Sequence, residues 1–280
     1  MVKAKIAFVC TECGSEYGQW QGQCGSCKAW NTLAQISLGS SSSPATKADF
    51  RQKSGYAGQN TSVQNLSEIN LESLPRLSTT IGELDRVLGG GLVPGSVVLI
   101  GGNPGAGKST LLLQVMCLLS SSEKGGLYVT GEESLQQVGM RSQRLKLPQD
   151  NLKMLAETNV ELICKAAQTI EPALIVVDSI QVMHSADVAS APGSVSQVRE
   201  SAAYLIQYAK QTNTVLFLVG HVTKEGNLAG PKVLEHMIDC FIMLEGGSDT
   251  KYRVLRGQKN RFGAVNELGV FAMTGLDLKE

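Results

Sequence analysis

Apolar segments of strand length alternate with segments of helix length along most of the chain from about Val63 onward. The apolar segments are nearly continuous, which is typical of strands buried on both faces of a parallel sheet. The predicted strands are Val97–Ile100, Leu127–Thr130, Leu174–Asp178, Val215–Gly220 and Phe241–Leu244. The predicted helices between them are Ser109–Ser121, Ser134–Leu145, Glu161–Gln168 and Val195–Thr212. This alternation predicts an α/β domain whose mostly parallel sheet is flanked by helices, with antiparallel edge strands at Tyr252–Arg256 and Val270–Met273.

The chain before this domain has a different composition. Residues 1–35 hold four of the seven cysteines and both tryptophans. Residues 36–62 contain the run Ser40 to Ser43, Pro44 and scattered Gly, Gln and Asn, with little that could be buried, which indicates a flexible linker. We therefore predict a small N-terminal module over 1–35, a linker over 36–62 and a single α/β domain over 63–280.

Charge and hydropathy exclude few functions. The 25 basic and 25 acidic residues balance, so any nucleic-acid surface has to be a local patch or loop. No apolar run approaches the roughly 18 residues of a membrane-spanning helix, and the N-terminus does not resemble a signal peptide. We expect a cytoplasmic protein, and in that reducing compartment paired cysteines favour metal binding over disulfides.

The N-terminal cysteines form two Cys-x-x-Cys pairs separated by ten residues. Two such knuckles facing each other give a closed tetrahedral sulfur site, which is typical of structural zinc. The predicted zinc ligands are Cys10, Cys13, Cys24 and Cys27. The alternative is two redox pairs or two disulfides. Trp20 and Trp30 are expected to pack this ribbon, and the remaining cysteines are expected to be core residues: Cys117, Cys164 and Cys240.

A complete phosphate-loop pattern, Gly-x-x-x-x-Gly-Lys-Ser, follows the predicted strand Val97–Ile100 and precedes an apolar helix. In that setting, backbone N–H groups and the helix N-terminus can hold the phosphates of ATP. The expected nucleotide-binding residues are Gly102, Asn103, Pro104, Gly105, Ala106, Gly107, Lys108, Ser109 and Thr110. Lys108 is expected to reach the β- and γ-phosphates, and the Ser109 hydroxyl is expected to bind Mg²⁺.

Carboxylates follow two other predicted strands. Asp178 ends Leu174–Asp178, where it could organise the Mg²⁺ ion beside the phosphate loop. Glu132 and Glu133 follow Leu127–Thr130, and one of them, with Glu132 preferred, could act as general base for the attacking water. The alternative is an acidic pair beside a helix N-cap. His221 is expected either to sense the γ-phosphate or to be structural.

These motifs resemble those of the bacterial RadA (Sms) family. The resemblance rests on the four-cysteine ribbon and on four segments: Leu88–Ser96 (LGGGLVPGS), Gly102–Gln114, Gly131–Ser134 (GEES) and Lys259–Gly263 (KNRFG). It implies a RecA-like ATPase core, related to DnaB helicases, that assembles as a homo-hexamer. Such proteins drive branch migration in homologous recombination and DNA repair, so single-stranded DNA, branched recombination intermediates and RecA recombinase are the expected partners.

The resemblance assigns roles to further residues. Lys259 and Arg261 are expected to act on ATP bound by the neighbouring subunit, although a solvated basic turn would have the same sequence. Two loops, His184–Ser196 and Val222–Leu234, are expected to be flexible enough to contact DNA, the second through Lys224 and Lys232. The alternative is that each loop is an ordinary solvated connection.

Family members continue into a C-terminal domain resembling the Lon protease, so a chain ending at Glu280 is expected to be a fragment or to lack that domain. Two other functions fit parts of the same pattern. A KaiC-like signalling ATPase would share the core and the paired glutamates. A nucleotide-switched interaction module would bind ATP, Mg²⁺ and zinc but would hydrolyse little.

Overall fold

The computed structural model describes residues 5–10, 15–26, 28–38, 63, 65, 75–119, 125–149, 151–221, 233–246, 250–274 and 277–280. The N-terminal part is a three-stranded antiparallel sheet in the order β2-β1-β3. Its strands are β1 (Lys5–Cys10), β2 (Glu16–Tyr17) and β3 (Leu33–Leu38). A small core of Cys10, Cys24 and Leu33 holds it together.

The α/β domain is built on a nine-stranded sheet in the order β12-β11-β10-β9-β4-β8-β7-β5-β6. Its six parallel strands are β4 (Val97–Gly102), β5 (Gly126–Thr130), β6 (Lys153–Ala156), β7 (Leu174–Asp178), β8 (Val215–Val219) and β9 (Cys240–Glu245). Antiparallel strands complete one edge: β10 (Tyr252–Asn260), β11 (Leu268–Met273) and β12 (Leu278–Lys279). The predicted α/β class, its mostly parallel sheet and its antiparallel edge are confirmed.

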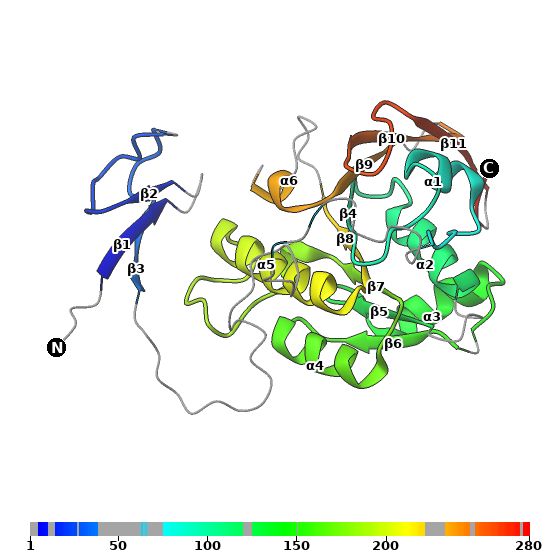
Figure 1. Ribbon diagram of the computed structural model, residues 1–280, viewed down its shortest axis with the longest axis horizontal. Coiled ribbons are helices and arrows are strands. Elements are labelled where there is room, and N and C mark those ends of the chain that lie inside the picture. The colour runs from blue at the N-terminus through cyan, green and yellow to red at the C-terminus, as the bar shows by residue number, and fades with distance from the viewer. Residues whose placement is uncertain are drawn as a thin grey trace.

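Helices cover both faces of this sheet (Figure 1). One face carries α1 (Gly82–Val87), α2 (Lys108–Leu119) and α3 (Leu135–Arg144). The other carries α4 (Val160–Ile170), the 3₁₀ helix η2 (Ile180–Val182), α5 (Val195–Thr212) and α6 (Val233–Met237). The strands between the layers are buried on both sides, which explains their continuous apolar sequences.

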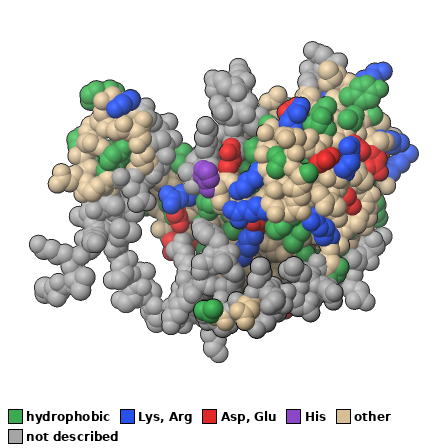
Figure 2. Space-filling view, turned by 45° about the horizontal axis from the view of Figure 1, so that its top comes forward, with side chains coloured by type: hydrophobic (Ala, Val, Ile, Leu, Met, Phe, Trp, Pro, Cys, Tyr) green, Lys and Arg blue, Asp and Glu red, His purple; other side chains and the backbone are tan. Residues whose placement is uncertain are grey.

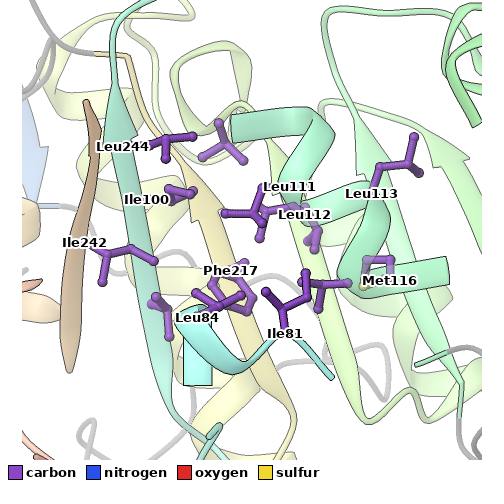
Figure 3. Packing of buried hydrophobic residues seen from close by; sticks show 14 of the residues in the cluster. Ile81, Leu84, Ile100, Leu111, Leu112, Leu113, Met116, Phe217, Ile242 and Leu244 are labelled. Carbon is purple, nitrogen blue, oxygen red and sulfur yellow. The ribbon is translucent and has the colours of Figure 1, made fainter. Parts of the chain in front are cut away.

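Helix α2 fixes the phosphate loop to the core. It is apolar around most of its circumference, and a helix of that kind is stable only when it is buried on several sides. Leu111, Leu112 and Met116 pack against Ile100 and Phe217 of the sheet (Figure 3). Each such buried side chain contributes about 1.5–3 kcal/mol relative to an exposed one. The loop between β4 and α2 is therefore held at both ends.

Several elements were not predicted. Strand β6 is short and partly exposed, so its sequence lacks the continuous apolar pattern of the central strands. Helix α1 has six residues, too few to show a helical period. The expectation that Trp20 and Trp30 pack the ribbon is wrong, since their exposed fractions are 57% and 70%. Among the described helices, none combines the length and apolarity needed to cross a membrane.

Candidate nucleotide-binding site and zinc site

The phosphate loop joins the carboxyl end of β4 to the first residue of α2. At Gly102 the backbone has φ of 153°, and a Cβ atom there would lie 2.4 Å from the carbonyl oxygen of Leu244. Only glycine fits this close approach of two backbones. Ala106, nearly fully buried, donates from its backbone nitrogen to Asn103 O at 3.1 Å and so closes the turn. The loop thus has the curled backbone that binding of phosphate oxygens requires, and the binding itself stays a prediction.

Lys108 lies inside this cradle. Its Nζ donates to the carbonyl oxygens of Gly102 at 2.7 Å and Asn103 at 3.0 Å, and the residue is only 4% exposed. Burial lowers the pKa of Lys108, and the carboxylates of Asp178 and Glu132 oppose that shift. A desolvated ammonium group gains strongly when anionic oxygens enter the cradle.

Asp178 ends β7 and lines the same pocket as Lys108. Its Oδ2 accepts a hydrogen bond of 2.6 Å from the hydroxyl of buried Tyr128, and this bond orients the carboxylate. Burial and the Asp178 charge hold the pKa of Tyr128 well above its usual value, which keeps it a donor. Ser109 also lines this pocket, and hydroxyl and carboxylate oxygens are ligands that Mg²⁺ accepts.

The two neighbouring glutamates have different partners. Glu132 Oε1 accepts a hydrogen bond from the hydroxyl of Ser179 and lies 3.4 Å from Nε2 of His221. Glu133 instead forms an ion pair with Arg141 of α3. The Glu132 carboxylate therefore interacts with Ser179 and His221, and the Glu133 carboxylate with Arg141. The catalytic roles of both residues stay predictions.

One pocket of about 430 Å³ brings most of the predicted nucleotide-site residues together, while Gly102, Asn103 and Ala106 do not line it. Its lining comprises Pro104, Gly105, Gly107, Lys108, Ser109, Thr110, Thr130, Glu132, Glu133, Arg141, Arg144, Asp178, His221 and Met273. The sequence analysis missed Arg141 and Arg144. The position of Arg141 offered a signal. It follows the α3 N-cap Ser134 by about two helical turns, so both residues lie on the same face of the helix.

Lys259 and Arg261 lie at the amino ends of the parallel strands, whereas the pocket lies at their carboxyl ends, and neither residue lines this pocket. Lys259 Nζ donates to the carbonyl oxygens of Glu235 at 2.5 Å and Ile238 at 2.8 Å. Burial and neighbouring Arg261 lower the pKa of Lys259. These contacts place both cations beside α6, at the amino ends of β4 and β9.

Arg261 is held by a buried carboxylate. Its Nη1 donates to Asp239 Oδ1 at 3.2 Å, while Asp239 Oδ2 accepts from Val97 N at 3.0 Å and from Lys210 Nζ. The Arg261 side chain nonetheless remains 54% exposed. It is anchored at one nitrogen and accessible to another molecule.

The first predicted DNA-contacting loop is ordered around one side chain. Gln197 is 2% exposed, and its Nε2 donates to three carbonyl oxygens of the loop, those of Ser185, Val188 and Ser190. The buried amide satisfies its hydrogen bonds by tying part of His184–Ser196 to α5, and contact of this loop with DNA stays a prediction. Lys224 and Lys232 lie outside the described residues. On the face shown in Figure 2, Lys and Arg side chains lie among Asp and Glu side chains.

The ribbon repeats one backbone turn at its two cysteine pairs. Cys10 N donates to Ser15 O at 3.0 Å, and Cys24 N donates to Ala29 O at 2.9 Å. Both cysteines are fully buried. Two equivalent turns that each bury a thiol fit a tetrahedral zinc ion, whose role would be structural. Cys13 and Cys27 lie outside the described residues, so the complete ligand set stays a prediction.

Comparisons with known proteins agree with this architecture. Residues 8–35 match the family described as a rubredoxin metal binding domain, and residues 67–227 match the family described as an AAA domain. The chain is 62% identical to the DNA repair protein RadA of Escherichia coli strain K12, in an alignment covering 100% of this chain and 61% of the relative. It is 46% identical to the DNA repair protein RadA of Bacillus subtilis strain 168, covering 100% of this chain and 60% of the relative. The chain thus spans about 60% of the length of these relatives.

The resemblance to RadA predicted from the sequence motifs is confirmed across the whole chain. The AAA domain match covers more than half of the sequence and includes the phosphate loop, both glutamates, Asp178 and His221. The chain therefore belongs to the AAA domain family of P-loop proteins and is similar throughout to the bacterial DNA repair protein RadA.

Proposed function

We propose that this chain is the ATP-hydrolysing part of a DNA-dependent motor that acts in homologous recombination and DNA repair. The observation that carries the proposal is the single pocket lined by Lys108, Ser109, Asp178 and Glu132. A cation, a hydroxyl and two carboxylates around a glycine-rich cradle are the groups that phosphoryl transfer to water requires.

In this proposal the chain's own residues divide the chemistry. The loop backbone and Lys108 bind the phosphates and neutralise charge that develops on the transferred group. Glu132, oriented by Ser179 and His221, accepts a proton from the attacking water. Ser109 and Asp178 would hold Mg²⁺, which supplies Lewis-acid stabilisation of the phosphate oxygens when bound.

Lys259 and Arg261 would contact ATP held by a neighbouring subunit in a homo-hexamer. This part is supported by their position at the amino ends of the parallel strands, away from their own pocket, and by the exposure of Arg261. A cation supplied by a neighbour makes hydrolysis depend on subunit contact, as a motor needs. The proposed substrates are single-stranded DNA and branched recombination intermediates, with RecA recombinase as partner protein, and the activity is branch migration in the cytoplasm.

The test is the steady-state rate of ATP hydrolysis by the full chain, with and without single-stranded DNA, at low and high salt. Stimulation by DNA that decreases as salt rises would support the motor, because phosphate contacts release counterions. Turnover indifferent to DNA would favour a signalling ATPase for this chain. ATP binding without turnover would favour an interaction module. Lys108→Ala is the control for hydrolysis by contaminating enzymes.

A further inference from the structure

Arg141 is a partly buried cation in the nucleotide pocket that the proposed reaction does not use. It projects from α3, its side chain is 18% exposed, and it is one of the residues lining the pocket. One guanidinium nitrogen, Nη2, pairs with Glu133 Oε1. The other, Nη1, is buried and has no hydrogen-bond partner among the described residues.

A buried guanidinium N–H without an acceptor is unfavourable, and it becomes favourable once an oxygen reaches it. Guanidinium groups bind carboxylate and phosphate oxygens in the same forked geometry. The Glu133 carboxylate therefore binds the Arg141 guanidinium group that a nucleotide phosphate would also bind. Because the Glu133 side chain is 37% exposed, it can exchange Arg141 for water at little cost.

We propose that Arg141 binds a phosphate oxygen of the nucleotide and that Glu133 is a positioning residue that competes for Arg141. This inference rests on the proposed nucleotide binding in the same pocket, but it requires neither hydrolysis nor DNA. It divides the paired glutamates: Glu132 faces the attacking water, and Glu133 controls a phosphate-binding cation. The backbone of Glu133 is fixed by Thr130, whose Oγ1 donates to the Glu133 carbonyl oxygen at 2.7 Å and accepts from the Glu133 backbone nitrogen at 3.1 Å.

The charges around the pocket agree with this division. Three cations line it, Lys108, Arg141 and Arg144, and three carboxylates face them. Asp178 is oriented by Tyr128, and Glu132 by Ser179 and His221. Of the three carboxylates, Glu133 is paired directly with an arginine of the pocket wall. Removing the Glu133 charge therefore leaves the Arg141 guanidinium available to another anion.

The experiment is equilibrium binding of fluorescent ATP and ADP analogues to the full chain with Mg²⁺, using single and double variants. Arg141→Gln should weaken binding about tenfold, the size expected for one charge-assisted hydrogen bond. Glu133→Gln should tighten binding severalfold, because Arg141 loses its competitor. The double variant should match Arg141→Gln, since the effect of Glu133 passes through Arg141.

The same cycle can overturn the proposal. If Glu133→Gln tightens binding equally in the Arg141→Gln background, the cause is general repulsion of the nucleotide by the Glu133 charge. If Arg144→Gln, one helical turn further on, weakens binding as much as Arg141→Gln, the pocket uses net charge and no specific contact. Arg141→Lys keeps the charge but loses the fork, and equal binding by this variant would also contradict the phosphate contact.

Folding of each variant is checked by far-UV circular dichroism and thermal unfolding, and Arg141→Lys remains informative if Arg141→Gln unfolds. Failure of this inference is distinguishable from failure of the proposed function. Wild-type chain that binds no nucleotide would overturn both. Wild-type chain that binds nucleotide while Arg141→Gln binds it equally well would overturn only the role of Arg141.

Discussion

Gly89 and Gly263 lie backbone against backbone: a Cβ atom on Gly263 would come within 2.9 Å of the Gly89 Cα. The contact joins the Leu88–Ser96 segment to the Lys259–Gly263 segment, which are far apart in the sequence. Arg76 strengthens the junction, since its Nη2 donates to Phe262 O at 2.6 Å. These two segments, which both contribute to the family resemblance, form one structural unit. That unit carries the exposed cation Arg261.

Gly263→Ala is expected to destabilise the domain by about 1–3 kcal/mol, because the added methyl group must push two backbones apart. Urea unfolding followed by circular dichroism measures this change. Gly139→Ala is the matched control: a Cβ at Gly139 meets nothing within 4 Å, and alanine favours helix α3. The control should stabilise by about 0.5–1 kcal/mol. Equal stability of Gly263→Ala and wild type would show that the junction relaxes freely.

The sequence predicted this fold well where one local signal sufficed. Continuous apolar strands identified β4, β5, β7, β8 and β9, and the glycine spacing identified the phosphate loop. These features depend on residues adjacent in the chain. Their agreement with the structure is therefore expected from periodicity and turn chemistry.

What the sequence could not show depends on residues brought together by folding. The pairing of Asp239 with Arg261 requires β9 and β10 to be neighbours. The pairing of Glu133 with Arg141 depends on the direction in which α3 leaves the sheet. Exposure of Trp20 was missed because aromatic residues in small modules are usually buried, whereas this ribbon buries cysteines instead.

Lys108→Ala should weaken ATP binding by at least about tenfold while the domain stays folded. The variant loses a buried cation whose partners become phosphate oxygens, and each tenfold change corresponds to about 1.4 kcal/mol. Glu132→Gln is the comparison, because it should reduce turnover about a hundredfold or more and leave ATP binding close to wild type. Binding and turnover are measured on the same preparations. Normal turnover by Lys108→Ala would contradict the assigned site.

Mixtures of Arg261→Ala and Lys108→Ala subunits should hydrolyse ATP faster than either variant alone. In the mixture, an intact phosphate loop of one subunit can meet an intact Arg261 of the other. The measurement is turnover against mixing ratio, with assembly verified by light scattering. Arg256→Ala removes the same charge from β10, the strand that ends just before Arg261, and should retain activity by itself. No recovery at any ratio in assembled material would count against action on a neighbour's nucleotide.

Cys24→Ser should release zinc and unfold the ribbon but leave ATP binding within about twofold of wild type. The ribbon has a very small core, so metal binding supplies much of its folding free energy. Metal content is measured by elemental analysis, and ribbon unfolding by limited proteolysis, because Trp20 and Trp30 are already exposed in the folded ribbon. Cys164→Ser removes a buried thiol of α4 and should keep the metal. Wild-type protein purified without zinc would refute the assignment.

ATP affinity should decrease as pH rises through the pKa of Lys108. Burial lowers the pKa of Lys108 in the nucleotide-free protein, whereas bound phosphates favour its charged form. Binding is therefore tightest below the pKa of the free protein and is lost as pH rises through it. Tyr128 does not interfere, because its pKa is held well above the ordinary value. As pH is raised toward the ordinary lysine pKa of about 10.4, dissociation constants should rise for wild type and stay flat for Lys108→Met. A flat wild-type profile, or a parallel rise in Lys108→Met, would assign the phosphate contact to other groups of the loop.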